Sequence, residues 1–238
     1  MNHRWQRAAC LMGLLVSAGV DAAGVADQGT WETTLSPRDI NRDGTIDAYY
    51  DSSQGITWLA NADVNGRMTW SDAVTWVAEL DVHGVSGWRL PKLVDTAAPG
   101  CDASNTGTDC GFNVDTATSE MAHMYFVTLG NLANPHHDAP DQPPGLGLTN
   151  TGPFQNLRAF HYWSALPYAP EPSHSWNFIY NVGYQGKFDM DIPAYAWPVH
   201  DGDVPAVPEP GTFALALLGL LAVAAGGRMR RLSSSIRV

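Results

Sequence analysis

Residues 68–91 constrain the fold more than any other stretch, because an amphipathic helix pattern leads there through a turn into a short Trp-Arg-Leu-Pro segment. Thr69 is placed to cap the helix, with Asp72 three residues later as in a capping box. One face of the predicted helix is an apolar stripe made of Trp70, Ala73, Val74, Val77 and Leu80. We therefore expect this stretch to form core and not a catalytic site.

The rest of the pattern predicts one more helix and several strands. The helix is expected over residues 118–129, capped by Thr118 or Ser119, with an inner face of Met121, Met124, Tyr125 and Leu129. His123 on this helix is expected to be a surface histidine or a satisfied core histidine rather than a ligand. Alternating apolar residues and turn residues predict strands over residues 48–51, 55–59, 160–164, 176–182, 187–190 and 194–200.

Four short motifs resemble a known domain family: Ile56-Thr57-Trp58, Met68-Thr69-Trp70, Gly87-Trp88-Arg89-Leu90-Pro91 and Tyr162-Trp163-Ser164. On these motifs, residues 38–204 resemble the family of unknown function DUF1566, also called the Lcl C-terminal domain. The resemblance implies a single α+β domain of the C-type-lectin-like or sulfatase-modifying-factor-like fold, with two helices packed on antiparallel strands. The family has no agreed activity, so the resemblance predicts a fold and not a function.

The charge balance limits the partners of the domain, which we expect over residues 27–206. This range holds 7 of the 13 Lys and Arg residues and 22 of the 24 Asp and Glu residues, a net charge of −15. Such a surface repels nucleic acid and anionic lipid headgroups, so we expect no nucleic-acid partner. It is compatible with cation binding, or with simple solvation of a secreted protein.

The first 26 residues have the three parts of a secretory signal peptide. Arg4 and Arg7 precede an apolar run over residues 8–20, and small residues follow at Val20, Ala22, Ala23 and Ala26. We therefore expect export and cleavage by signal peptidase, and we leave residues 1–26 out of the predicted fold.

The other end of the chain holds Pro208-Glu209-Pro210, an apolar run over residues 212–227, and then Arg228, Arg230 and Arg231. At about 1.5 Å per residue, the run spans roughly 24 Å, so it predicts a short transmembrane helix that is marginal as a permanent anchor. The arginines are expected to stop it on the cytoplasmic side. Residues 207–231 resemble the PEP-CTERM sorting signal. The resemblance implies an inner-membrane intermediate in a Gram-negative bacterium, recognition of the motif by an exosortase, and delivery to the cell surface or extracellular matrix. An ordinary tail anchor is the alternative.

Residues 39–47 have the pattern of a calcium-binding loop, with candidate ligands Asp39, Asn41, Asp43, Thr45 and Asp47. Gly44 stands where such a loop turns sharply. Tyr50 replaces the bidentate glutamate at the last position, which predicts a weak site at the millimolar end of extracellular modules. The alternative is a turn in which these side chains accept hydrogen bonds from backbone amides. Calcium is the one candidate cofactor.

Cys101 and Cys110 are the only cysteines that remain after removal of the leader. In an exported chain such a pair predicts a disulfide, which closes a short loop and stabilises by roughly 2.5 to 3 kcal/mol in the chain-entropy model. The intervening residues carry no histidine pair, which argues against a zinc site.

The stretch over residues 134–157 is rich in Pro, Gly, Asn and Asp and is long for a connection. Its candidate ligand contacts are His136, His137 and Asp138, although a plain surface loop or a disordered segment is the alternative. By analogy with lectin-like folds, we expect the ligand site in this stretch. Trp163 and Trp176 are further candidates, because exposed aromatic rings stack on sugars. The period-2 pattern around them also fits the core.

These features favour a non-enzymatic, exported surface or matrix protein that binds an extracellular polysaccharide. An enzyme is the rival hypothesis, by analogy with the sulfatase-modifying-factor fold, but that chemistry needs cysteines that bind copper, and no catalytic motif such as G-x-S-x-G or H-E-x-x-H is present. A structural or ice-binding matrix protein is a third hypothesis, although the chain lacks regular threonine arrays.

Overall fold

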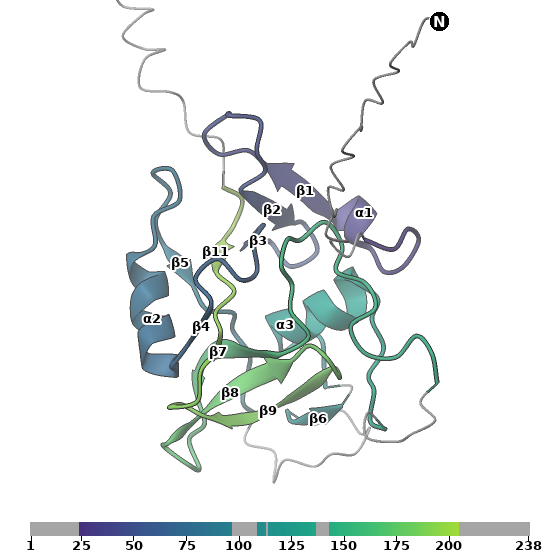
Figure 1. Cartoon of the computed structure of the whole chain (residues 1–238), viewed down its shortest axis with the longest axis vertical. Coiled ribbons are helices and arrows are strands. Elements are labelled where there is room, and N and C mark those ends of the chain that lie inside the picture. The colour runs from purple at the N-terminus through teal and green to yellow at the C-terminus, as the bar shows by residue number, and fades with distance from the viewer. Residues whose placement is uncertain (1–23, 97–108, 113, 137–142, 205–238) are drawn as a thin grey trace, which may run out of the picture.

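The computed structural model describes residues 24–96, 109–112, 114–136 and 143–204, which form two β-sheets with a few helices at their margins (Figure 1). One sheet has the strand order β1-β2-β3-β11-β5, and the other has the order β4-β10-β7-β8-β9-β6. Every pair of neighbours is antiparallel except β10 and β7. The expected α+β class is therefore confirmed, with strands in the majority.

The first sheet joins segments from both ends of the domain. Its strands are β1 (Leu35–Arg38), β2 (Ala48–Asp51), β3 (Ile56–Leu59), β11 (Val199–Asp201) and β5 (Trp88–Arg89). All four residues of β3 are buried, because β3 lies in the middle of the sheet between β2 and β11. The Ile-Thr-Trp and Gly-Trp-Arg-Leu-Pro motifs thus meet in one sheet through β11.

The second sheet contains the strand-rich last third of the chain. Its strands are β4 (Arg67–Met68), β10 (Ala194–Tyr195), β7 (His161–Pro167), β8 (His174–Ile179), β9 (Tyr184–Asp189) and β6 (Gly111–Phe112). We expected the central strand to be half-buried, but in β8 the residues of both faces are buried, from Ser175 to Phe178. Asn177, on the face opposite Phe178, is 1% exposed and contacts His161.

The predicted strand over residues 194–200 is wrong. The chain forms β10 in the second sheet, leaves it, and forms β11 in the first sheet. Trp197 lies between the two short strands, fully buried, and its Nε1 donates to the carbonyl oxygen of Leu59 at 2.8 Å. The alternation of residues 195, 197 and 199 therefore reflects a crossing between sheets and not one continuous strand.

Helix α2 (Trp70–Glu79) begins where the sequence predicts. The Thr69 hydroxyl accepts a hydrogen bond from the backbone N–H of Asp72 and donates to its carboxylate at 2.7 Å. Ala73 and Val77 are buried, as expected, but Val74 is 37% exposed. The buried stripe is narrower than predicted because α2 packs along a single line against β5 and β7.

The second predicted helix is present in a modified form. It begins as α3 (Glu120–His123), which is capped by Ser119, and continues into the π-helix η1 (Met124–Thr128). A further short helix, α1 (Trp31–Thr34), lies near the start of the domain. The wider turn of η1 closes through a 2.8 Å hydrogen bond from Leu129 N–H to the Met124 carbonyl. The predicted inner face is confirmed, since all four of its residues are fully buried: Met121, Met124, Tyr125 and Leu129.

A cluster of rings fills the space between the sheets and η1. We call it the aromatic interior, and its fully buried members are Trp58, Tyr125, Tyr162, Phe178, Tyr180 and Trp197. The ring centroids of Trp58 and Trp197 lie 4.5 Å apart, and Tyr125 packs edge-on against Tyr180 at 5.6 Å. Burial raises the pKa of the Tyr180 phenol well above its ordinary value.

Candidate functional site

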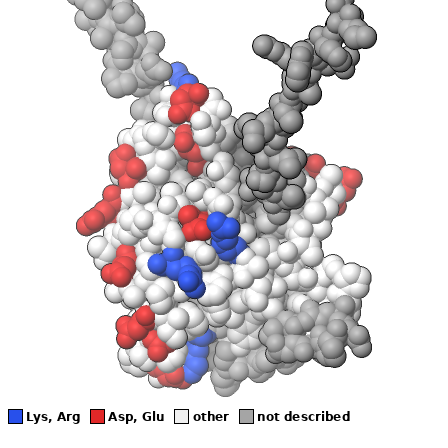
Figure 2. Space-filling model, viewed as in Figure 1, with Lys and Arg blue, Asp and Glu red and all other residues white. Residues whose placement is uncertain are grey.

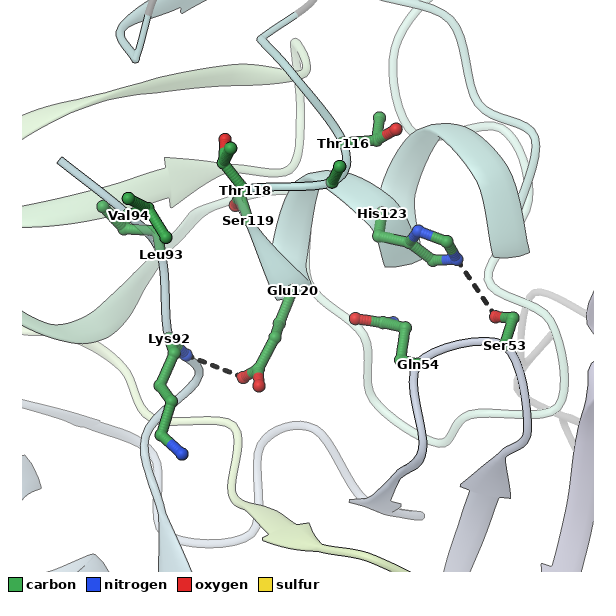
Figure 3. Close-up of a pocket in the computed structure, with 11 residues that line it drawn as sticks. Ser53, Gln54, Lys92, Leu93, Val94, Thr116, Thr118, Ser119, Glu120 and His123 are labelled. Carbon is green, nitrogen blue, oxygen red and sulfur yellow. Dashed lines mark hydrogen bonds between the residues drawn. The ribbon is translucent and has the colours of Figure 1, made fainter. Parts of the chain in front are cut away.

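A cavity of about 480 Å³ opens beside α3, on the side turned away from the aromatic interior (Figure 3). We call it the α3 pocket. It lies between the turn after β2, the segment after β5 and the segment that leads into α3. Its lining residues are Ser53, Gln54, Lys92, Leu93, Val94, Thr116, Ala117, Thr118, Ser119, Glu120 and His123.

Glu120 anchors one wall of the pocket. Its carboxylate accepts two parallel hydrogen bonds from Arg89, at 2.7 and 2.8 Å, and a third from the backbone N–H of Lys92 at 2.7 Å (Figure 3 shows the Lys92 contact). Ser119 caps the same helix by accepting from the N–H of Ala122. The position of α3 is therefore fixed by the arginine of the Trp-Arg-Leu-Pro motif.

Arg89 joins two carboxylates from different elements. Besides Glu120, its Nε donates to Asp201 on β11 at 2.9 Å, and Lys92 Nζ lies 3.2 Å from the same carboxylate. Burial alone lowers the pKa of the Arg89 guanidinium, but the hydrogen bonds that it donates to Glu120 and Asp201 outweigh burial and raise that pKa. The Arg89 contact lowers the pKa of Asp201 to about 2. These charges neutralise one another within the wall.

Ser53 and His123 form the side of the α3 pocket opposite Glu120. The Ser53 hydroxyl lies 3.0 Å from His123 Nε2 (Figure 3) and donates its proton to the buried carboxylate of Asp51. Since a hydroxyl has one proton, Nε2 of His123 must carry the proton of the second contact. The histidine therefore acts here as a donor to Ser53 and not as a base that activates it.

Apart from Glu120 and Lys92, the polar side chains that line the α3 pocket carry hydroxyl, amide and imidazole groups. Hydroxyls come from Thr116 and Thr118, an amide comes from Gln54, and an imidazole comes from His123. The surface around the domain is predominantly acidic, and Figure 2 shows acidic side chains scattered over one face with few basic ones. A pocket of this size and polarity suits a neutral ligand with many hydroxyl groups better than an anion.

In the predicted calcium loop, the oxygen atoms accept hydrogen bonds from backbone amides. Asp39 accepts from the N–H groups of Asp43 and Gly44 at 3.1 and 2.8 Å, and Asp47 accepts from Ile40 at 2.8 Å. Asn41 donates to Asp43 and lowers the pKa of its carboxyl. Thr45 donates its backbone N–H to Asp43 at 2.8 Å.

The alternative to a calcium site, a turn in which these side chains accept hydrogen bonds from backbone amides, is thus present. In the described part of the chain, no group of three or more Asp, Glu, His or Cys residues is arranged to hold a metal ion. A second cavity of about 430 Å³ borders the loop at Thr45 and Asp47, where His83 Nε2 lies 3.2 Å from the Asp47 carboxylate. Calcium binding by this loop stays a prediction.

The two tryptophans proposed as ligand contacts are core residues instead. Trp163 is fully buried and donates from its indole to the carbonyl of Met68 at 2.9 Å. Trp176 is 2% exposed and packs with Leu93 and Tyr168. Neither ring presents a face to a ligand, because each lies on a central strand covered by neighbouring segments.

The predicted ligand loop over residues 134–157 is largely structural in its second half. Asn150 is fully buried, and Phe154 is 4% exposed against Trp197. His136 is exposed on the surface, but His137 and Asp138 lie outside the described residues. The α3 pocket is formed by other segments, so the described part of this loop is not where the candidate site lies.

Several predicted features lie in parts of the chain that the structure does not describe: Cys101, residues 1–23 of the leader predicted over residues 1–26, the motif Pro208-Glu209-Pro210, the apolar run over residues 212–227, and Arg228, Arg230 and Arg231. Cys110 is described and is 1% exposed. Its disulfide with Cys101 stays a prediction. None of the helices within the described ranges has the length and apolar character needed to cross a bilayer.

Sequence reasoning missed most of the α3 pocket. It placed Thr118 or Ser119 at the cap of this helix, but it gave no role to Ser53, Gln54 or Lys92. The one available clue was the arginine of the Gly-Trp-Arg-Leu-Pro motif, since a half-buried guanidinium needs a carboxylate partner. Searching the predicted helix starts for that partner points to Glu120.

Two family models match the sequence. The model described as the Lcl C-terminal domain matches residues 47–200, and the model described as the PEP-CTERM protein-sorting motif matches residues 206–231. None of the curated proteins matches the chain. The first match covers most of both sheets, α2, α3 and the α3 pocket, and the second begins just after the described domain ends at Val204.

Proposed function

The chain belongs to the Lcl C-terminal domain family, and we propose that it is a surface-sorted binding protein whose α3 pocket holds a segment of an extracellular polysaccharide. The PEP-CTERM motif makes it an exported protein that an exosortase sorts to the cell surface or the extracellular space. What we propose in addition is that the domain binds polysaccharide at that location.

The observation that carries the proposal is the chemistry of the α3 pocket. Hydroxyl, amide and imidazole groups line a cavity of about 480 Å³, a volume typical of sites for small ligands. Its one acid, Glu120, is occupied by Arg89, and its one lysine is paired with Asp201. A sugar unit, with its many hydroxyl groups and no charge, complements such a lining.

A binding role agrees better with this lining than a catalytic role. The Ser53 hydroxyl donates to Asp51, so His123 is not placed to accept its proton. The Glu120 carboxylate accepts hydrogen bonds from three N–H groups, so it is not free to act as a general acid or base. We therefore propose recognition without chemistry, and we place the polysaccharide at this pocket instead of at residues 134–157.

The test is binding of the mature exported protein to a panel of neutral and acidic polysaccharides, such as dextran, mannan and alginate, by calorimetry and by retention on immobilised polymer. We expect binding to a neutral polymer, and a three- to tenfold loss of affinity in Thr118→Val, which removes one hydroxyl from the pocket.

Thr75→Val is the matched control. Thr75 Oγ1 donates to the carbonyl of Ser71 on the exposed face of α2, as Thr118 Oγ1 donates to Asp115, both at 2.9 Å. We expect the control to bind like the unmodified protein. Absence of retention on every polymer would leave a purely structural role in the matrix. Equal affinity of the two variants for a bound polymer would show that the polymer does not bind at the α3 pocket.

A further inference from the structure

The residues just before α1 are part of the folded domain. Gly24 lies against Gly152 and the indole of Trp31, so closely that a Cβ atom at position 24 would be 3.0 Å from backbone atoms of Gly152. A Cβ atom there would also lie 2.7 Å from Cζ2 of the Trp31 ring, so the ring or the Gly152 segment would have to shift. The fold therefore favours glycine at position 24.

Hydrogen bonds hold the same segment in place. The backbone N–H of Val25 donates to the side-chain oxygen of Asn150 at 2.9 Å, and the indole of Trp31 donates to the carbonyl of Val25 at 3.2 Å. Asn150 is fully buried, and its amide nitrogen donates to the carbonyls of Gln28 and Leu129 at 3.0 and 2.8 Å. A buried asparagine thus ties residues 24–28 to the end of η1.

The segment continues into an equally close backbone contact. Thr30 N–H donates to the carbonyl of Thr128 at 2.9 Å, and the adjacent Gly29 has a φ of +79°. A Cβ atom on Gly29 would lie 2.4 Å from that same carbonyl oxygen. The folded domain therefore includes the residues from Gly24 onward, well before residue 47, where the family match starts.

Signal peptidase needs small residues at the first and third positions before the bond that it cuts. Between Val20 and Ala26, three stretches qualify: Val20-Asp21-Ala22, Ala22-Ala23-Gly24 and Gly24-Val25-Ala26. A cut after Ala26 would remove the N–H that Asn150 binds and the carbonyl that Trp31 binds. The small size of Gly24 is explained by packing on Gly152 and needs no role in cleavage.

We propose that the leader is removed on the N-terminal side of Gly24, at the bond after Ala22, so that the mature protein keeps Gly24 and Val25 as structural residues. The sequence pattern alone leaves the cut anywhere up to Ala26. The packing of residues 24–28 favours the first of the three stretches, because the other two place the cut after Gly24 or after Ala26 and so remove Gly24 from the mature protein.

The test is the N-terminus of the mature protein, measured by intact mass and by N-terminal sequencing after expression of the full chain in a Gram-negative host. A chain that begins at Ala23 is the expected result. A chain that begins at Val25 or Asp27 overturns the proposal, whatever the outcome of the polysaccharide experiment.

Two matched variants of the full chain sharpen the test. Ala22→Lys places a charge at the expected cleavage position, and we expect loss of normal processing with accumulation of precursor. Ala26→Lys places the same charge at an exposed position of the folded domain, and we expect the unmodified N-terminus. Blocked processing in Ala26→Lys alone would contradict the proposal.

Discussion

The aromatic interior and the α3 pocket lie on opposite sides of one helix, yet different forces hold them. On the inner side, Met121, Met124 and Tyr125 are fully buried, and the Tyr125 ring packs on Phe178 and Tyr180 at the second sheet. On the outer side, Glu120 and His123 are held by hydrogen bonds to Arg89 and Ser53. The inner side gains stability from buried area, whereas the outer side depends on each polar group keeping its partner.

The difference shows why one side is suited to core and the other to binding. Rings in the interior touch several neighbours each, so no single contact is indispensable, but removing one ring leaves a large void. In the pocket wall, removing one partner leaves a charge without compensation, while the remaining lining groups stay accessible to a ligand.

Trp197→Ala tests the interior side and should have the largest effect. Trp197 is fully buried at the junction of the two sheets and packs on Trp58, Phe154 and Tyr180. We expect a loss of about 4 kcal/mol in the free energy of unfolding, measured by urea denaturation. A loss below about 2 kcal/mol would mean that the sheets do not depend on this ring, and the contrast between the two sides would fail.

Arg89→Met tests the pocket side and should cost about 2 to 3 kcal/mol. It leaves the largely buried carboxylate of Glu120 with only the Lys92 N–H as donor. The matched control is Arg38→Met, because Arg38 makes the same two-bond contact with Asp203 at 2.7 and 2.8 Å on the surface. We expect the control to cost less than about 1 kcal/mol.

A second substitution separates the lost charge partner from lost packing at the same position. Adding Glu120→Gln to Arg89→Met removes the uncompensated charge, so we expect the double variant to recover part of the stability in denaturation experiments. If Arg89→Met and Arg38→Met cost the same, the pocket wall is not held in the way described.

The two sides also differ in how far the sequence predicts them. The inner face of the second helix follows from spacing and from the Ser119 cap, both of which are local signals. The α3 pocket was missed, because Ser53, Lys92 and Glu120 are far apart in sequence and meet only through the pairing of β11 with β5 and β3. Local patterns do not contain that pairing.

The same limit explains the wrong strand over residues 194–200. Alternation of apolar residues predicts extended backbone, which is present on both sides of Trp197, but it does not say which sheet each half joins. The ligand-contact prediction for Trp163 failed for a related reason. An alternating pattern assumes one open face, and the second sheet has strands buried on both.

His161→Gln tests a buried polar group in the second sheet and should have an effect of roughly 2 kcal/mol that depends on pH. His161 stacks on Phe188 at 4.1 Å, accepts a hydrogen bond from Asn177, and burial lowers its pKa to about 4. Between pH 6.5 and pH 4 the unfolded chain binds a proton there that the folded chain does not, so stability falls as the pH falls.

The measurement is the free energy of unfolding of both proteins at several pH values. We expect the unmodified protein to lose about 2 kcal/mol more than His161→Gln between pH 6.5 and 4, after allowance for the partial exposure of the ring. Below pH 4 the difference should stay constant. Parallel curves over the whole range would show that the histidine titrates normally in the folded protein.

Asp39→Ala should have the smallest effect, about 1 kcal/mol in calcium-free buffer, because it removes the acceptor of the N–H groups of Asp43 and Gly44 in an exposed turn. Like Glu120, Asp39 acts by accepting donors from its own chain, but water can replace those donors here. If the loop binds calcium at millimolar affinity, 10 mM calcium adds about 1.4 kcal/mol to the unmodified protein and nothing to the variant. If the two proteins respond equally to calcium, the only role of these oxygen atoms is to accept the backbone hydrogen bonds of the turn.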